Sequence, residues 1–334
     1  MDEYFDFYGF TTQVSSPSTE LLDEVRRDFA YFRTSPPDRL PQLRAELRPT
    51  PPPYGDLPSV PAAFFTPRNV CFRADHLTYI DYFGEALAVF DRREQRCTVY
   101  ATDLNLLHEI AYLFILSMVG QHLDRKRLHR VHALGLAHLN RGILILLPSG
   151  GGKSTLALDL LRKPGFLLLA EDTPLIDRRG RILPFPLRLG VRPGRDTGVP
   201  AEYLRTKPRM EFDPKTLIDL DYFHDRLAGP TASAFLLIGE RNLGDVSRII
   251  PLPKPNALKA LLKYMVVGLG VYQGLEFLLE RGLGDTLGQG SVVTSRLCNS
   301  LVLLARTPAY RFILGRNTER NSHALVDFLD RRHA

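Results

Sequence analysis

The stretch from Gly142 to Thr155, with the sequence GILILLPSGGGKST, constrains the fold of this chain more than any other segment. Five apolar residues, 143–147, are typical of a short buried strand; three glycines follow, and Lys153-Ser154-Thr155 opens an apolar-periodic run that predicts a helix. Without Cβ atoms, glycines let successive backbone N–H groups turn toward one anion, and the N-terminus of a helix adds positive potential there. The stretch therefore predicts a strand, a phosphate-binding loop and a helix in succession.

The loop supplies the residues that we expect to hold a nucleotide. They are Ser149, Gly150, Gly151, Gly152, Lys153, Ser154 and Thr155. Lys153 is expected to reach the β- and γ-phosphates of ATP, and the Ser154 hydroxyl to ligate Mg²⁺. The usual pattern has a glycine five residues before the last loop glycine, where this chain has Leu147. An ordinary glycine-rich turn is the alternative.

Composition bounds the class of protein. The chain has 334 residues, of which 44% are hydrophobic and 24% charged, which is typical of a globular protein with one large domain or two. Apolar runs stay shorter than the roughly 18 residues of a membrane span. The N-terminus lacks the pattern of a signal peptide, and the three cysteines are too far apart to indicate a zinc site or a disulfide framework. We expect a cytoplasmic protein.

The positive charge is concentrated in one segment. Residues 178–209 contain nine Lys or Arg and two acids, a local charge of +7 that accounts for the net charge of +6 of the whole chain. Because this segment follows the glycine loop, it favours binding of an anionic substrate or of nucleotide phosphates; a solvated basic face is the alternative. No aromatic-rich or helix-turn-helix pattern accompanies the charge, so we do not expect nucleic acid as a partner.

Residues 1–125 are predicted to form an N-terminal α+β region with proline-rich connections. Its expected elements are a strand at 4–14, a helix from Ser16-Pro17 to about Arg33, an edge strand at 43–47, a meander of strands over 70–102, and a helix at 104–122 capped by Asp103.

Residues 126–334 are predicted to form the domain that carries the loop. A strand at 131–139 and a tight turn lead into the loop strand, and another buried strand at 166–170 ends in Glu171-Asp172. The remaining expected elements are a hairpin over 175–184, strands at 234–239 and 310–314, and helices at 256–267, 271–280 and 322–331.

Three of these features occur in a recognisable order: His132 on a strand, the glycine loop, and the acidic pair after the next buried strand. This arrangement resembles the catalytic domain of the HPr kinase/phosphorylase family and, more loosely, the phosphoenolpyruvate carboxykinase-type nucleotide fold. His132 precedes Lys153 by 21 residues, as in that family. The resemblance covers roughly residues 130–185. It implies an α/β, mixed-sheet P-loop kinase domain, here with an N-terminal α+β extension.

The resemblance also implies roles for individual residues. Lys153 and Ser154 would hold ATP phosphates and Mg²⁺, Glu171 would assist the metal, Asp172 would accept the proton of the acceptor hydroxyl, and His132 would lie near the transferring phosphate. An ordinary buried histidine is the alternative for His132, and a pure metal ligand is the alternative for Asp172. His138 we expect to be structural. Candidate contacts to phosphate or acceptor are Arg178, Arg179, Arg188 and Arg192.

The expected function is therefore that of an ATP-dependent serine kinase whose acceptor is a peptide, a small protein or the free amino acid, with no membrane partner. The family resemblance adds the expectation of a homo-oligomer. Two departures leave alternatives open: Leu147 replaces a loop glycine, and 186–190 carry no acid where the family supplies a metal-binding glutamate. The alternatives are a nucleotide-binding regulatory or scaffold protein without turnover, and an NTPase driven by a partner.

Overall fold

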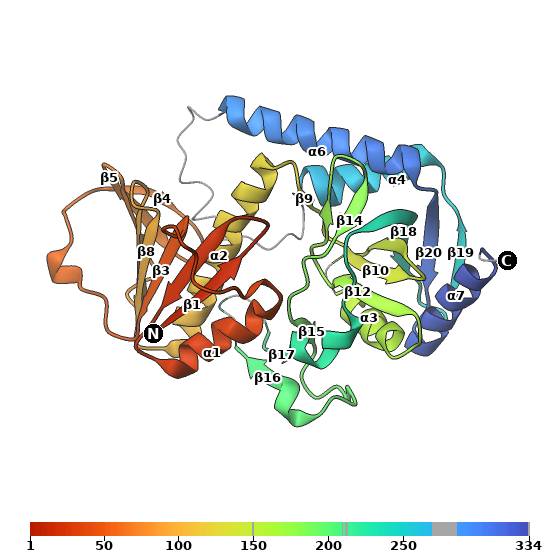
Figure 1. Cartoon of the computed structure of the whole chain (residues 1–334), viewed down its shortest axis with the longest axis horizontal. Helices are drawn as coiled ribbons and strands as arrows, with labels where there is room; N and C mark the ends of the chain where they lie inside the picture. The colour runs from red at the N-terminus through yellow and green to blue at the C-terminus, as the bar shows by residue number, and fades with distance from the viewer. Residues whose placement is uncertain (149, 209, 211–212, 269–285, 333–334) are drawn as a thin grey trace.

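The computed structural model describes residues 1–148, 150–208, 210, 213–268 and 286–332. Within them the chain is a mixed α/β structure with an eight-stranded, a nine-stranded and a three-stranded sheet, which confirms the α/β class. The eight-stranded sheet lies at one end of the molecule and the nine-stranded sheet at the other, with the three-stranded sheet beside their junction (Figure 1). The two large sheets divide the chain between Arg125 and His129.

The first sheet has the strand order β1-β2-β3-β8-β7-β6-β5-β4. Its strands are β1 (Asp2–Asp6), β2 (Thr11–Ser15), β3 (Leu43–Arg48), β4 (Ala62–Phe65), β5 (Val70–Ala74), β6 (Leu77–Asp81), β7 (Ala86–Asp91) and β8 (Arg96–Ala101). The meander expected over 70–102 is confirmed, because β5 to β8 pair antiparallel in succession.

Two expectations for this sheet are wrong. The single strand predicted at 4–14 is a hairpin, because Tyr8 and Gly9 adopt φ of 58° and 82° and reverse the chain between β1 and β2. The predicted edge strand β3 is interior: it pairs parallel with β2 on one side and with β8 on the other, and its flanking prolines lie outside the paired residues. The edge strands of this sheet are β1 and β4.

Two helices accompany this sheet. Helix α1 (Thr19–Asp28) is capped by the side chain of Ser18 rather than Ser16, and a 3-10 turn, η1 (Ala30–Phe32), follows it. Helix α2 (Leu104–Arg125) begins after Asp103, whose carboxylate accepts from two backbone N–H groups as predicted. In the described part of the chain, α2 is the one helix long and apolar enough to cross a membrane, and 72% of its apolar window is buried within the protein.

The second sheet has the order β12-β10-β11-β18-β14-β13-β9, and β20 joins it beside β18. Its strands are β9 (His129–Arg130), β10 (Leu134–His138), β11 (Arg141–Leu146), β12 (Phe166–Ala170), β13 (Leu175–Ile176), β14 (Arg181–Leu183), β18 (Thr231–Arg241), β19 (Arg248–Pro251) and β20 (Ala309–Leu314). The expected strand at 131–139 is interrupted, because the N–H of His132 bonds to Tyr264 and that of Ala133 to Asp172, outside the strand ladders.

Helices cover both faces of this sheet. Ile143 and Ile145 of β11 pack into the core beneath α3 (Lys153–Leu161) and α7 (Thr318–Asp330), whereas Leu144 and Leu146 pack into the core beneath α4 (Lys254–Leu261) and α6 (Thr286–Arg306). Burial on two faces explains the uninterrupted apolar run of β11. Helix α4 continues into a π-helical turn, η5 (Leu262–Val266), and α6, which no pattern predicted, crosses the top of the view (Figure 1). The helix predicted at 271–280 lies outside the described residues.

The three-stranded sheet was also not predicted. It has the order β15-β17-β16 and consists of β15 (Leu189–Val191), β16 (Leu204–Lys207) and β17 (Lys215–Ile218). The 3-10 turn η3 (Ala201–Tyr203) precedes β16, and another, η4 (Leu220–Arg226), follows β17. A 3-10 turn of the first region, η2 (Tyr54–Asp56), lies between β3 and β4. Most of the basic segment therefore belongs to this sheet and its connections.

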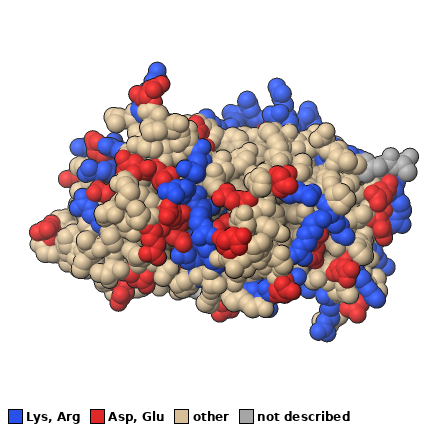
Figure 2. All heavy atoms as spheres, turned by 60° about the horizontal axis from the view of Figure 1, so that its bottom comes forward, with Lys and Arg blue, Asp and Glu red and all other residues tan. Residues whose placement is uncertain are grey.

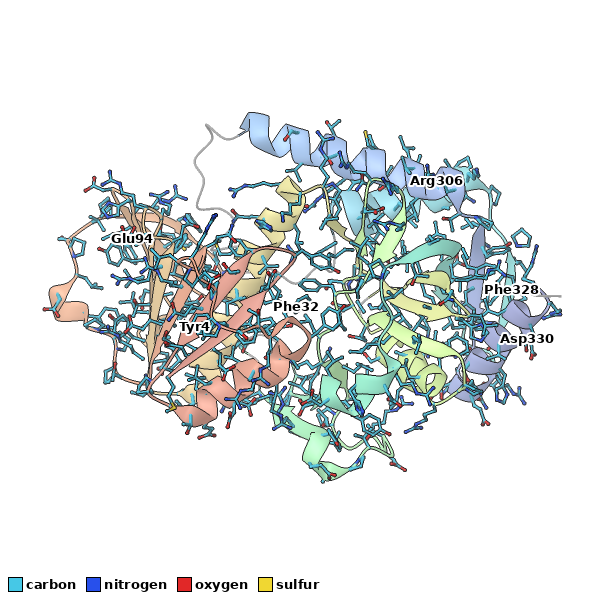
Figure 3. All side chains as sticks on the ribbon, viewed as in Figure 1. Tyr4, Phe32, Glu94, Arg306, Phe328 and Asp330 are labelled. Atoms are coloured by element: carbon cyan, nitrogen blue, oxygen red, sulfur yellow. The ribbon has the colours of Figure 1, made fainter. Side chains whose placement is uncertain are left out.

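An aromatic cluster joins the two halves. The ring centroid of Phe32 lies 4.6 Å from that of Phe7 and 4.9 Å from that of Phe185, a residue that follows β14. Figure 3 shows Phe32 near the middle of the molecule, whereas Phe328 on α7 lies at the far end of the second half. Because Phe7, Phe32 and Phe185 are all buried in one cluster, the core of the first region continues into the second.

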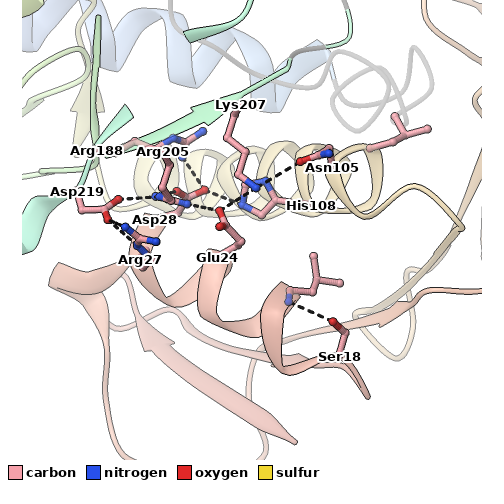
Figure 4. Close-up of polar contacts among 12 residues, drawn as sticks. Ser18, Glu24, Arg27, Asp28, Asn105, His108, Arg188, Arg205, Lys207 and Asp219 are labelled. Atoms are coloured by element: carbon pink, nitrogen blue, oxygen red, sulfur yellow. Dashed lines mark hydrogen bonds and ion pairs between the residues drawn. The ribbon is translucent and has the colours of Figure 1, made fainter. Parts of the chain in front are cut away.

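A buried ion cluster reinforces this junction (Figure 4). Arg205 of β16 contacts Asp28 of α1 and Asp219, each at 2.8 Å, and also pairs with Glu24. The carboxylate of Asp28, which is 0% exposed, is also met by Arg188 at 2.7 Å and His108 of α2 at 2.9 Å. Burial alone would raise the pKa of Asp28, but Arg188, His108 and Arg205 hold it well below its usual range. On the face that Figure 2 shows, acidic and basic side chains lie next to each other, and the basic side chains do not form one continuous surface.

We predict that Asp28→Asn lowers the free energy of unfolding by about 3 kcal/mol or more, because it leaves buried cations without their carboxylate. Asp23→Asn on the same helix is the matched control: its side chain is 55% exposed, and a change within about 0.5 kcal/mol is expected. Urea unfolding of both variants measures the difference. Equal stability of the two variants would show that the Asp28 cluster does not stabilise the fold.

The same carboxylate predicts a pH dependence. The pKa of Asp28 in the folded protein lies below its unfolded value of about 3.9. The ionised carboxylate therefore contributes fully to the free energy of unfolding above about pH 5, and this contribution is lost as the pH falls toward the folded pKa. The stability difference between the wild type and Asp28→Asn is therefore constant from about pH 5 to 7 and narrows below about pH 4. Urea unfolding as a function of pH tests this, and a difference that widens in acid would contradict it.

Candidate functional site

Two glycines of the loop adopt left-handed backbone conformations. Gly150 and Gly152 have φ of 73° and 96°, and α3 begins immediately afterwards at Lys153. Gly151 approaches the chain closely: its N–H bonds to the Pro148 carbonyl at 2.9 Å, and a Cβ there would lie 2.8 Å from that oxygen. Each position therefore favours glycine: Gly150 and Gly152 because of their positive φ, and Gly151 because the chain passes too close for a side chain. Ser149 lies outside the described residues.

Leu147, which replaces the expected loop glycine, is part of the core. Its side chain is fully buried in the cluster beneath α3 and α7. It packs over Gly239 of the parallel neighbour β18, where an added Cβ would lie 2.3 Å from Leu147 Cδ2. The missing side chain at Gly239 thus makes room for the extra one at Leu147.

Three predicted catalytic residues meet beside the loop. Lys153 Nζ lies 2.9 Å from His132 Nε2 and 3.5 Å from Asp172 Oδ1, and it donates to the Leu147 carbonyl at 3.2 Å. His132 Nδ1 lies 3.1 Å from Asp172 Oδ1. An ammonium can only donate, so Nε2 of His132 accepts and the ring proton is on Nδ1, facing Asp172. His132 thereby links the cation to the carboxylate.

The acidic pair follows β12 at the edge where β11 also ends. Glu171 Oε1 accepts a hydrogen bond of 2.6 Å from Ser154 Oγ, in the first turn of α3. Burial, and then the charge of Asp172, raise the pKa of Glu171 above its usual range, against the opposing effects of Lys153, Ser154 and Lys215. A cation bound next to Glu171 would therefore favour its ionised form.

Asp172 has the opposite electrostatics. Burial favours its neutral form, but its contact with His132 and the charges of Lys153 and Lys215 together lower its pKa. Its side chain is 40% exposed, so it can be reached from the surrounding space. Asp172 is thus an ionised carboxylate at the end of a buried strand, available to a hydroxyl donor.

The oxygen donors fit Mg²⁺. Ser154 and Glu171 offer a hydroxyl and a carboxylate within hydrogen-bond distance of each other, and these are hard ligands of the kind that Mg²⁺ takes alongside phosphates and water. In the part of the chain that the structure describes, no group of three or more His, Cys, Asp or Glu forms a metal cage.

The loop and these residues line one cavity of about 1590 Å³. Its opposite wall belongs to α2, which contributes Asn105, His108, Glu109, Tyr112 and Leu116. This contribution from the N-terminal region was not predicted. A signal exists in the sequence, because these positions recur at helical spacing and four of them interrupt an apolar helix with polar groups. Lys215 and Arg195 also line the cavity, and Arg195 donates to Thr155 Oγ1 at 2.7 Å.

The four predicted arginines divide into two pairs. Arg188 and Arg192 line the cavity, although the guanidinium of Arg188 pairs with Asp28 and stacks over Tyr112 at 3.9 Å. Arg178 and Arg179 do not reach it: they lie exposed in the turn of the β13–β14 hairpin, beside a separate hollow of about 300 Å³. Neither residue is among those that line the cavity beside the glycine loop, so the structure adds no support for their predicted role. The ring of His138 packs against Phe166 in a tilted arrangement, with 4.4 Å between the centroids, as expected of a structural residue.

Comparison with known proteins adds no family. No family model matches this chain, and no curated protein matches it. The chemical interpretation therefore depends on the geometry described above.

We predict that Gly151→Ala weakens binding of inorganic tripolyphosphate at least about tenfold, because the new Cβ would displace the loop backbone at Pro148. Gly55→Ala is the control, since a Cβ there meets nothing within 4 Å. Calorimetric titration of both variants provides the measurement, and thermal unfolding verifies that they fold. Unchanged affinity in Gly151→Ala would show that this loop does not hold the anion.

Proposed function

We propose that this protein is an ATP-dependent kinase that transfers the γ-phosphoryl group of ATP to a hydroxyl, with a fold of the HPr kinase type. The acceptor is the serine of a peptide or small protein, or free serine. One observation supports this most: Lys153, His132 and Asp172, from three segments of the chain, meet within 3.5 Å at the start of the helix that follows the glycine loop. Phosphoryl transfer needs this combination of an anion cradle, a cation and a carboxylate.

The loop and α3 would hold the ATP phosphates. Backbone N–H groups and the helix N-terminus favour negative charge, and Lys153 neutralises the transferring group. Ser154 and Glu171 are the residues that would hold Mg²⁺, which on binding neutralises charge on the phosphates. That cation would also favour the ionised form of Glu171, whose pKa is raised by burial and by Asp172.

Asp172 would position and deprotonate the acceptor. The hydroxyl oxygen attacks the γ-phosphorus, the bond from that phosphorus to the β,γ-bridging oxygen breaks, and ADP leaves with the electron pair while the hydroxyl proton passes to Asp172. A lowered pKa makes Asp172 a weak base, but the transition state of this reaction is loose and demands orientation more than proton removal. His132, whose Nδ1 lies 3.1 Å from Asp172 Oδ1, would help to keep that carboxylate oriented.

The first test is binding of ATP with Mg²⁺ to the wild type and to Lys153→Ala, measured by calorimetry. We expect the variant to lose at least about tenfold in affinity, since it lacks the buried ammonium at the loop. Lys259→Ala, an exposed lysine of α4, should bind like the wild type. Absence of ATP binding to the wild type would refute the proposal.

The second test concerns turnover. Asp172→Asn is expected to lower acceptor-dependent ADP release by about 10² to 10⁴-fold while ATP binding persists. The control is Asp225→Asn, whose side chain is 65% exposed on η4. Mass analysis of peptide, protein and amino-acid acceptors identifies the product. Nucleotide binding without ADP release from any acceptor would favour a regulatory protein, and phosphate release that requires a partner would favour an NTPase.

A further inference from the structure

A buried arginine forms part of the cavity wall and is not used by the proposed chemistry. Arg130, at the end of β9, is 5% exposed and lines the same cavity as His132, two residues further along the chain. Leu116 of α2 lines it as well and accepts the hydrogen bond that Arg130 Nη1 donates, at 3.1 Å. The N-terminal region and the loop domain therefore meet at this guanidinium.

Arg130 has no carboxylate partner in the described part of the chain. The nearby acid is Asp124, but its oxygens bind Arg296, at 2.7 and 3.2 Å, and His129, at 2.9 Å. A buried guanidinium carries five N–H donors and a full charge, and leaving that charge uncompensated is costly. Burial lowers the pKa of Arg130 to about 10 even though Asp124 opposes the effect, and the neighbouring Arg296 adds to the lowering.

Helix α2 is shaped to accommodate this charge. An added Cβ at Gly120 would lie 1.7 Å from Arg130 Nη2 and 2.4 Å from its Cζ. A glycine inside a helix is less favourable than an alanine, because it loses more backbone freedom on folding. The helix thus has a glycine where the guanidinium of Arg130 lies, and among the described residues no carboxylate forms an ion pair with that guanidinium; this favours a ligand at Arg130 over an internal ion pair.

We propose that Arg130 binds an anionic group, a carboxylate or a phosphate, on the acceptor of the kinase, so that the acceptor is a small molecule. This inference rests on the proposed function. A guanidinium forms two parallel hydrogen bonds with either anion. Because Arg130 is almost completely buried, a surface loop of a folded protein cannot reach it, whereas a cavity of about 1590 Å³ holds a nucleotide together with a second small molecule. Among the proposed acceptors, the free amino acid fits best.

The experiment is calorimetric titration of protein loaded with Mg²⁺ and a non-hydrolysable ATP analogue, so that the phosphate loop cannot take the probe. The probes are L-serine against L-serinamide, and glycerol 3-phosphate against glycerol. We expect one anionic probe to bind at least about tenfold more tightly than its counterpart. Arg130→Gln should lose about 10- to 100-fold of that affinity, and Arg130→Lys should keep part of it. The serine pair reports a carboxylate, and the glycerol pair reports a phosphate.

Arg93→Gln, an exposed arginine in the β7–β8 turn, is the matched change in charge and should bind the probes like the wild type. Thermal unfolding verifies that the Arg130 variants fold. Equal probe affinity in Arg130→Gln and the wild type, or no anion binding by the loaded wild type, overturns the inference. If the ATP analogue itself does not bind, the proposed function fails; the same titrations on Lys153→Ala without nucleotide then test Arg130 independently.

Discussion

The buried ion cluster around Asp28 and Arg205 holds the two halves of the molecule in one arrangement, and the cavity depends on that arrangement. It fixes α1 against the three-stranded sheet, and through His108 it includes α2. Since one face of α2 forms the wall opposite the glycine loop, the site requires both halves. A buried pair of this kind adds less net stability than its short distances suggest, because each charge first loses its hydration. Its consequence is geometric: the carboxylate and the guanidinium are satisfied only when α1 and β16 are docked.

Around the glycine loop too, the neighbours of each charged group determine its protonation. Lys153 and His132 hold Asp172 ionised, whereas Glu171, beside Asp172 and Ser154, has a raised pKa. The pKa values of two adjacent carboxyl groups are thus shifted in opposite directions by their neighbours, in keeping with the roles proposed for Asp172 toward a hydroxyl and for Glu171 toward a cation. Arg130 extends the positive charge toward α2, where it donates to the Leu116 carbonyl, while the oxygens of the nearby Asp124 bind Arg296 and His129.

Much of the local structure follows from sequence patterns. The caps at Asp103, the meander of β5 to β8, the tight hairpin turns and the glycine loop were predictable because each is set by residues a few positions apart. Predictions failed where a distant partner decided the outcome. The proline-flanked strand β3 is interior because β2 and β8 pair with it, and the strand at His132 is interrupted because Tyr264 and Asp172 accept its backbone hydrogen bonds.

The sequence by itself determined the glycine loop between strand and helix, the acids at the end of the next buried strand and the position of a histidine ahead of both, since strand, turn and helix signals are local. Only the tertiary structure decided which charges meet. It places Arg178 and Arg179 outside the cavity, engages Arg188 with Asp28, and brings α2 and Arg130 to the wall opposite the loop. It also shows that Leu147 is compatible with the loop, because Gly239 on the neighbouring strand leaves room for it. Contacts between residues so far apart in sequence arise from packing and buried charge, which no local pattern encodes.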